Sequence, residues 1–230
     1  MTSPTSEGNT TKPTLGYWKI RGLASAIRYQ LAYSNVSYDQ EVYEQGDGPE
    51  FNSACWFDVK HDQGLTYPNL PYLKDGSLLL TEAGAIQRYC AKKWCPELLC
   101  DDDAEMYGKA EMVSGVVNDI KAIFTSHTYL MGDGDKKELA DAVMSRFARI
   151  AEELSGSKFL IGDRICCADF VFAELVEMME FVSDGEIYKA HPSLEAYRNR
   201  MFELPNMKKA LEEEKKLTFN NKCGKINNVV

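Results

Sequence analysis

The segment Tyr67-Pro68-Asn69-Leu70-Pro71-Tyr72-Leu73 places two prolines three residues apart in an otherwise strand-like stretch. Pro71 has no N–H to give to a ladder, so it should mark the entrance to a strand and not its middle. If the Leu70–Pro71 bond is cis, the backbone before it faces outward and can pair with an extended, peptide-like ligand. An ordinary proline turn would explain the heptapeptide equally well, so the surrounding sequence has to decide.

Outward from this segment the chain reads as a small α/β unit. Asp75-Gly76 between two apolar runs is a strong hairpin signal. Leu23, Ile27 and Leu31 recur at helical spacing further upstream. In chain order we expect strand 14–18, helix 23–34, strand 37–43, strand 69–73, strand 77–80 and helix 82–94. This β-α-β then β-β-α order is the plan of a thioredoxin-like domain, in which the proline before the third strand is characteristically cis.

The second half of the sequence is predicted to be wholly helical. Pro96 and an acidic cluster interrupt the pattern over 95–102. The helix from residue 168 is apolar around most of its circumference, with only Glu174, Glu177 and Glu180 forming a polar edge, so it should be the buried centre of a bundle. The expected helices are 103–131, 136–155, 168–183, 192–204 and 206–217. The expected organisation is a flexible tail 1–13, a thioredoxin-like domain 14–94, a linker 95–102, an all-α domain 103–217 and a C-terminal tail 218–230.

Composition excludes several classes of function. Acidic residues outnumber basic ones by 35 to 26, giving a net charge of −9, which argues against a nucleic-acid surface but allows a local basic site for a small anion. There is neither an 18-residue apolar run nor an apolar N-terminal signal segment, so we expect no membrane span and no secretion. Seven cysteines without a Cys-x-x-Cys pair indicate reduced thiols in the cytoplasm, with no metal site.

Tyr17 and Trp18 stand at the end of the first strand, just before a helix start. Backbone N–H groups and the helix dipole favour an anion at such a place. A tyrosine hydroxyl there can donate a charge-assisted hydrogen bond to a thiolate, whose parent thiol has a pKa of about 8.5 and is ionised only to a few per cent at neutral pH. Considered alone, the two aromatic residues could equally cap a sheet edge.

Considered together, these segments are specific: the sequence resembles the cytosolic glutathione transferases, most closely the mu class. The resemblance covers about residues 14–217 and is strongest up to Ala91. The segments that carry it are Leu15-Gly16-Tyr17-Trp18, Ile20-Arg21-Gly22-Leu23, Trp56 with Lys60, the heptapeptide 67–73, Asp75-Gly76 and Thr81-Glu82. The implied fold is a thioredoxin-like α/β domain followed by an all-helical domain. The implied activity is conjugation of the glutathione thiolate, as co-substrate, to apolar or aromatic electrophiles in detoxification.

The resemblance also implies roles for individual residues. Tyr17 would be the catalytic hydroxyl that stabilises the thiolate, and the backbone of Leu70 before cis-Pro71 would pair with the cysteinyl unit. Asp119 would reach the γ-glutamyl ammonium from the partner subunit of a homodimer. The whole glutathione site would comprise Tyr17, Trp18, Leu23, Trp56, Lys60, Asn69, Leu70, Pro71, Glu82, Ala83 and the partner's Asp119.

On the electrophile side the resemblance implies Trp18, Leu23 and Tyr129. Tyr67 occupies the position where mu enzymes usually carry a phenylalanine that plugs into a pocket of the partner subunit. A lone helical tyrosine such as Tyr129 is more often a packing residue, and Tyr67 could equally be an exposed loop residue.

Three positions depart from the family pattern. Ala83 stands where a serine usually binds the γ-glutamyl carboxylate, and Ser53 stands where many mu enzymes have a basic residue. Both changes should weaken anion binding. Cys166 replaces the usual Ser or Thr cap of the helix from residue 168, which should cost about 1 kcal/mol of stability.

Other functions remain open at this stage. A sigma-like glutathione-dependent isomerase of the prostaglandin D synthase type is a second enzymatic possibility. A non-catalytic ligand carrier or a structural protein of the same fold is a third, because Ala83 and Ser53 depart from the pattern. Tyr17, Trp56, Lys60 and Asn69 favour the transferase. A thiol–disulfide oxidoreductase is disfavoured, because tyrosine stands where that chemistry needs cysteine.

Overall fold

The computed structural model describes residues 12–131 and 133–228, so the tail expected over residues 1–13 lies almost wholly outside the described part. The N-terminal elements surround one four-stranded sheet with the strand order β2-β1-β3-β4. Strands β1 and β2 are parallel, whereas β3 pairs antiparallel with both β1 and β4. The elements are β1 (Thr14–Trp18), α1 (Ser25–Tyr33), β2 (Asp39–Tyr43), α2 (Ala54–Phe57), β3 (Tyr72–Asp75), β4 (Leu78–Thr81) and α3 (Ala83–Trp94).

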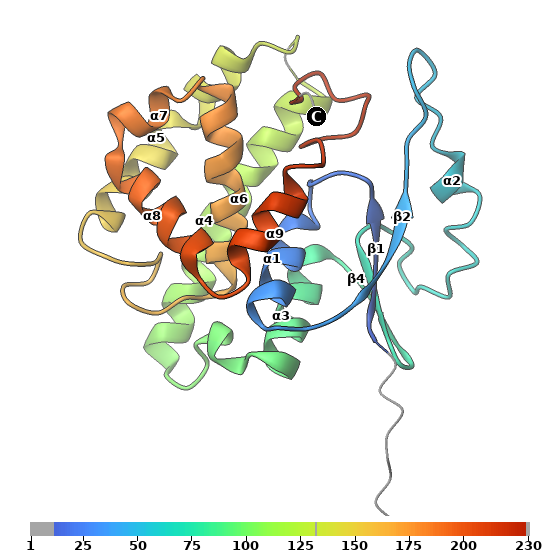
Figure 1. Ribbon diagram of the computed structural model, residues 1–230, viewed down its shortest axis with the longest axis horizontal. Helices are drawn as coiled ribbons and strands as arrows, with labels where there is room; N and C mark the ends of the chain where they lie inside the picture. The colour runs from blue at the N-terminus through green and yellow to red at the C-terminus, as the bar shows by residue number, and fades with distance from the viewer. Residues whose placement is uncertain (1–11, 132, 229–230) are drawn as a thin grey trace, which may run out of the picture.

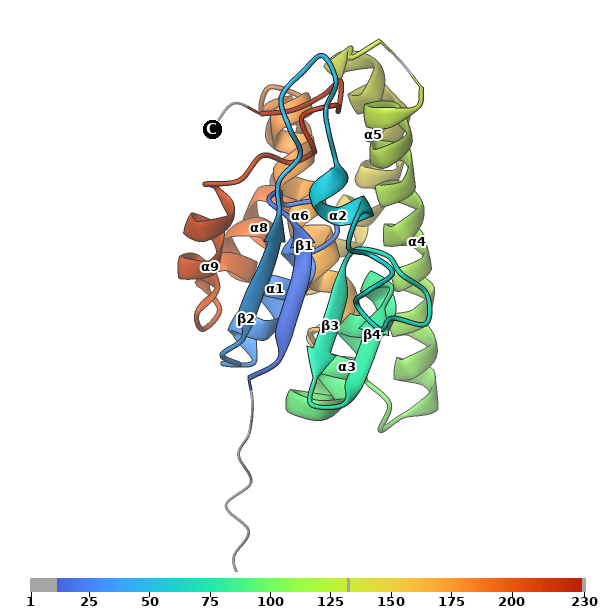
Figure 2. The same cartoon turned by 90° about the vertical axis from the view of Figure 1, so that its right-hand side faces the viewer.

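Helices α1 and α3 lie between the sheet and the helical part, while α2 lies on the outer side of the sheet (Figure 1). The remaining elements form a helical bundle with α6 at its centre (Figures 1 and 2). They are η1 (Pro96–Leu99), α4 (Ala104–Tyr129), α5 (Lys136–Leu154), α6 (Cys167–Val182), α7 (Glu186–Ala190), α8 (Pro192–Glu203) and α9 (Met207–Glu214). The predicted fold class, a thioredoxin-like sheet unit followed by a helical one, is confirmed.

The predicted strand 69–73 is wrong at its start. The Leu70–Pro71 bond is cis, as expected, and β3 begins only at Tyr72. Asn69 belongs to the turn, where its side-chain oxygen accepts the N–H of Leu70 at 2.9 Å. The sequence prediction also missed η1 and the short helix α7.

The predicted polar edge of α6 is wrong as well. Glu174 and Glu177 are buried, at 1% and 6% exposure. Glu174 accepts from Arg21 at 2.6 Å, and Glu177 accepts from Arg198 at 2.6 Å. A buried carboxylate requires a partner, and each of these carboxylates finds an arginine from another part of the chain.

The N-terminal cap of α6 retains both contacts of the usual capping box, although Cys166 replaces Ser or Thr. The backbone N–H of Cys166 donates to the Asp169 carboxylate at 2.8 Å, and the Cys166 thiol faces the backbone N–H of Asp169. The same carboxylate accepts from Leu160 N–H and from the Tyr197 hydroxyl. Burial raises the pKa of Asp169 to about 6.

Gly16 leaves room for an aromatic ring that lies over β1 on the face of the sheet. A Cβ at Gly16 would lie 2.1 Å from the ring of Tyr72, its partner in the register of β1 and β3. Tyr72 is fully buried, stacks on Trp56 and shares a 3.0 Å hydrogen bond with the Tyr43 hydroxyl. The ring has no room to retreat, because packed interiors leave few voids.

We therefore predict that Gly16→Ala destabilises the fold, because the added methyl group displaces the Tyr72 ring. Overpacking of this kind costs about 1–3 kcal/mol. Gly108→Ala in α4, where a Cβ would meet nothing within 4 Å, is the matched control and should stabilise slightly because alanine favours a helix. Urea denaturation of both variants measures the difference, and a Gly16→Ala midpoint at or above that of the parent protein would contradict this packing account.

Candidate active site

The site is built on the turn that joins β1 to α1. The backbone N–H of Leu23 donates to the Tyr17 hydroxyl at 2.9 Å. Gly22 in the same turn has φ +43°, and a Cβ on it would lie 2.6 Å from the Tyr17 oxygen. Glycine is therefore needed here for two reasons, its left-handed backbone and the close approach of the hydroxyl.

This hydrogen bond determines what the Tyr17 hydroxyl can do. Its oxygen already accepts an N–H, so its own proton remains available for an acceptor in front of it. Burial raises the pKa of Tyr17 to about 12, although the Leu23 N–H and the charge of Arg28 oppose the rise. The phenol therefore stays protonated at neutral pH and acts as a hydrogen-bond donor.

The Tyr17 hydroxyl faces a cavity of about 310 Å³ between the sheet unit and the helical bundle. This volume lies in the range of small-molecule sites. Most of the predicted site residues line the cavity, namely Tyr17, Trp18, Leu23, Trp56, Lys60, Asn69, Leu70 and Tyr129. The residues predicted from the sequence thus form part of the cavity wall. They come from three separate segments of the first 70 residues and from one position in α4.

Other predicted residues lie outside the lining of this cavity. Pro71 is buried behind Leu70, and Ala83 is half-buried at the start of α3. Glu82 precedes that helix with φ 72°, and its carboxylate accepts from the Asn69 amide at 3.5 Å. Asp119 is exposed on α4, and Tyr67 is 76% exposed on the loop before β3.

The loop between β2 and α2 lies beside the C-terminal segment. The Ser53 hydroxyl accepts from the Gln45 amide and donates to the Phe51 carbonyl oxygen, each at 3.2 Å. Ser53 is thus engaged within its own loop. Gln45 also accepts the Cys223 N–H at 3.0 Å, which connects this loop to the end of the chain.

Residues 215–228 form an ordered strap across the site, although the sequence suggested only a tail. The strap carbonyls of Thr218 and Phe219 accept from Arg21 N–H at 2.8 Å and from Gly22 N–H at 3.0 Å. Further along, Asn221 N–H donates to the Tyr129 hydroxyl at 2.8 Å. The strap therefore binds both the turn beside Tyr17 and the end of α4.

Several lining residues were missed by the sequence reasoning. The apolar ones include Phe124, Met178 and Phe219, from α4, α6 and the strap, where the sequence pattern indicated only core residues. Lys121 is the charged one, and its Nζ contacts the Gly22 carbonyl oxygen at 3.4 Å. Burial lowers the pKa of Lys121 to about 8. Its place on the same helix face as Tyr129, eight residues on, was the only sequence signal that could have found it.

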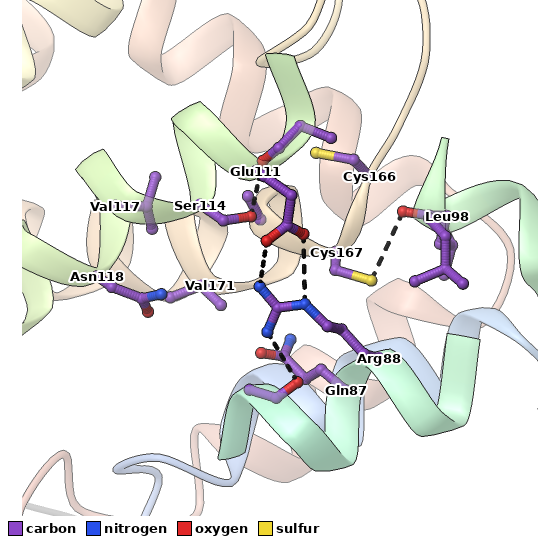
Figure 3. A pocket seen from close by; sticks show the side chains of 14 residues that line it. Gln87, Arg88, Leu98, Glu111, Ser114, Val117, Asn118, Cys166, Cys167 and Val171 are labelled. Carbon is purple, nitrogen blue, oxygen red and sulfur yellow. Dashed lines mark hydrogen bonds and ion pairs between the residues drawn. The ribbon is translucent and has the colours of Figure 1, made fainter. Parts of the chain in front are cut away.

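Two other hollows do not offer the same chemistry. A larger surface groove of about 650 Å³ lies between β2, α1 and α9, with charges of both signs such as Lys209 and Glu213. The third, of about 30 Å³ between α3, α4 and α6, has room for little more than a water. There Arg88 and Glu111 form an ion pair at 2.6 Å, and the Cys167 thiol points toward the Leu98 carbonyl (Figure 3).

Two further observations concern the described residues only. Within 12–131 and 133–228, no group of three or more His, Cys, Asp or Glu side chains is placed to hold a metal ion. In the same part of the chain, no helix has the length and apolar character that crossing a membrane requires.

Comparison with known protein families and chains gives a consistent result. Residues 13–92 match the family model for the glutathione S-transferase N-terminal domain, and residues 118–214 match that for the C-terminal domain. The chain is 32% identical to glutathione S-transferase Mu 7 of Mus musculus over 188 residues, which cover 80% of this chain and 83% of that protein. It is 31% identical to glutathione S-transferase Mu 2 of Homo sapiens over 191 residues, covering 81% and 84%.

Solved structures show the same fold. The pi-class glutathione S-transferase of Onchocerca volvulus superposes with a TM-score of 0.78 at 21% identity, covering 93% of this chain and all of that one. The crystal structure of the glutathione S-transferase Blo t 8 also gives 0.78, at 24% identity, covering 94% of this chain and all of that one.

Proposed function

Since this chain belongs to the glutathione S-transferase family, we propose that it conjugates the thiolate of glutathione to apolar electrophiles, with Tyr17 as its catalytic residue. One observation supports the assignment of Tyr17. The Tyr17 oxygen accepts the Leu23 N–H at 2.9 Å, so the hydroxyl proton remains available to an acceptor in the cavity. A donor fixed before the ligand arrives stabilises an anion without reorganisation.

The chemistry follows from that donor. Glutathione binds as a thiol, loses its proton to solvent, and the resulting thiolate accepts a hydrogen bond from Tyr17. Each pKa unit by which the site lowers the thiol pKa corresponds to about 1.4 kcal/mol of preferential anion stabilisation. The sulfur then forms a bond to an electrophilic carbon, and the leaving group departs with its electron pair.

The rest of the cavity supports a peptide-like co-substrate. Lys60 supplies a positive charge for the glycine carboxylate, beside Trp56 and Asn69. Leu70 lies at the cavity wall before the cis bond, where its carbonyl oxygen can pair with the N–H of the cysteinyl unit, while its own N–H donates to the Asn69 side chain. At the start of α3, backbone N–H groups and Glu82 would take the γ-glutamyl end, without the hydroxyl that Ala83 lacks.

Tyr129 and the strap support the electrophile assignment on the opposite side. The Tyr129 hydroxyl accepts the Asn221 N–H, so its proton can be donated into the cavity. Trp18 and Leu23 supply apolar surface beside it. Burial raises the pKa of Tyr129, which keeps the hydroxyl protonated at neutral pH.

The mu class is favoured within the family. The two curated relatives described above are named as mu enzymes, and both Trp56 and Lys60 line the cavity as that class requires. The presence of a protonated, oriented Tyr17 argues against a non-catalytic carrier. No observation on the described residues favours the sigma-like isomerase. All seven cysteines are free thiols, which supports a reducing, cytoplasmic location.

A homodimer is supported by an apolar patch on one side of the molecule. Met112 and Val116 of α4 are exposed, at 66% and 42%, and the exposed Asp119 lies on the same face of that helix. Tyr67, on the loop before β3, is exposed as well. A partner covering this patch would explain both the exposed apolar side chains and the exposed Asp119, which would then reach the glutathione of the other subunit.

We predict that Tyr17→Phe leaves glutathione binding nearly intact and lowers turnover about tenfold to a hundredfold, because the lost donor acts mainly on the anion. The pKa of the bound thiol should rise, so activity should require a higher pH. Thiolate absorbance against pH measures this. If the pKa of the bound thiol is unchanged, Tyr17 has no part in the mechanism.

We predict that Tyr67→Ala shifts the protein toward monomer on dilution, because aromatic anchors at interfaces contribute about 2 kcal/mol or more. Activity should fall with the dimer if each site borrows Asp119 from its partner. Asp119→Asn is the matched comparison: it should weaken glutathione binding and leave the dimer intact. Sedimentation velocity across a dilution series, with activity on the same samples, separates the two. If Tyr67→Ala is still a dimer at nanomolar concentration, Tyr67 is not an anchor of the interface. If the monomer is fully active, Asp119 does not contribute to the site of the partner subunit.

A further inference from the structure

Lys121 is the cation on the α4 side of the cavity. Its neighbours in the lining include the aromatic rings of Phe124 and Phe219 and the side chain of Met178. Its Nζ makes one long contact, 3.4 Å to the Gly22 carbonyl oxygen, and no carboxylate of the described chain lies within ion-pair distance. A partly buried ammonium in such surroundings is costly unless an anion joins it.

The position of Lys121 relative to Tyr17 is fixed by the turn between them. The turn gives its Gly22 carbonyl to Lys121 and its Leu23 N–H to Tyr17. The ammonium and the hydroxyl therefore act on the same end of the cavity. Tyr129, two helical turns beyond Lys121 on α4, adds a hydroxyl on the same side.

The two charges that act on Lys121 oppose each other. Burial lowers the pKa of Lys121 to about 8, with Glu174 of α6 opposing the change and Arg28 of α1 adding to it. The ammonium form therefore predominates at neutral pH and is lost as the pH rises through that value. Tyr17 and Tyr129 face the same space with raised pKa values and stay neutral.

We propose that Lys121 determines the electrophile specificity of this site, and that the preferred electrophiles are apolar molecules that carry a carboxylate. The carboxylate would pair with the ammonium, while the apolar body lies against Phe124, Met178 and Phe219. The proposal rests on the proposed function, because it concerns the second substrate of the same reaction. The net charge of −9 makes a local cation the more necessary for an anionic substrate.

A matched pair of aryl halides tests the proposal. The pair 4-chloro-3-nitrobenzoate and 4-chloro-3-nitrobenzamide share the ring and the leaving group and differ in charge. In each reaction the glutathione sulfur forms a C–S bond, the C–Cl bond breaks, and chloride leaves with the electron pair. The measured quantity is the ratio of kcat/KM for benzoate to that for amide, each divided by its uncatalysed rate.

We expect Lys121→Met to lower this ratio about tenfold or more, because a hydrogen bond to a charged group is lost. Lys121→Arg should retain most of the ratio, since the charge remains. Lys109→Met, on the same helix but exposed and paired with Glu105, is the matched control and should not change it. In the parent protein the ratio should fall as the pH rises through about 8, the pKa of Lys121.

A binding measurement separates this proposal from the proposed function. Titration of 3-nitrobenzoate and 3-nitrobenzamide in the presence of S-methylglutathione, followed by tryptophan fluorescence, needs no turnover. If the parent protein binds the benzoate more tightly than the amide and Lys121→Met abolishes this preference, the proposal is supported, even if neither aryl halide reacts. Absence of reaction with both halides would contradict the transferase activity and not the role of Lys121. Equal losses on both members of each pair in Lys121→Met would overturn it, since Lys121 would then serve the thiolate or the fold.

Discussion

The buried ion pair between Arg21 and Glu174 is the interaction on which the site depends. Arg21 belongs to the turn after β1, and Glu174 belongs to α6, 153 residues later; their side chains are 3% and 1% exposed. The pair therefore fixes the turn of the sheet unit against the centre of the helical bundle. The same turn presents Leu23 N–H to Tyr17, and removing one member of a buried pair typically costs 3–5 kcal/mol.

Other contacts reinforce the same turn without replacing that pair. Arg28 of α1 donates to the Ile20 carbonyl at 3.0 Å and forms a buried ion pair with Glu214 of α9. The Arg21 guanidinium lies over the Phe219 ring of the strap, 4.3 Å from its centroid. Helix α1, helix α6 and the strap thus all contact the turn formed by residues 20–23. Because this turn donates the Leu23 N–H to Tyr17, the orientation of the Tyr17 hydroxyl depends on all three.

Much of this could be predicted from the sequence because local signals agree with the fold. Pro71 and Asp75-Gly76 predicted the turns around β3, and the apolar circumference of α6 predicted the buried centre of the bundle. Ion pairs between residues far apart in the sequence could not be predicted. Glu174 reads as a solvated edge on its own helix, since nothing local reveals Arg21 as its partner. Lys121 was missed for the same reason, because its surroundings come from the β1–α1 turn, α6 and the strap. Asp119 and Tyr67 remain predictions that depend on a second copy.

Glutathione thiol ionisation in Glu174→Gln tests the central claim most directly. Removing a negative charge near the site would by itself lower the pKa of a bound thiol, because the anion would lose a repulsive neighbour. If the ion pair holds the turn, however, its loss displaces Leu23 N–H and the Tyr17 hydroxyl, and the thiol pKa rises. Thiolate absorbance against pH, with Glu180→Gln as the control on the same helix, distinguishes the two. The account predicts a higher thiol pKa in folded Glu174→Gln, and an equal or lower value would contradict it.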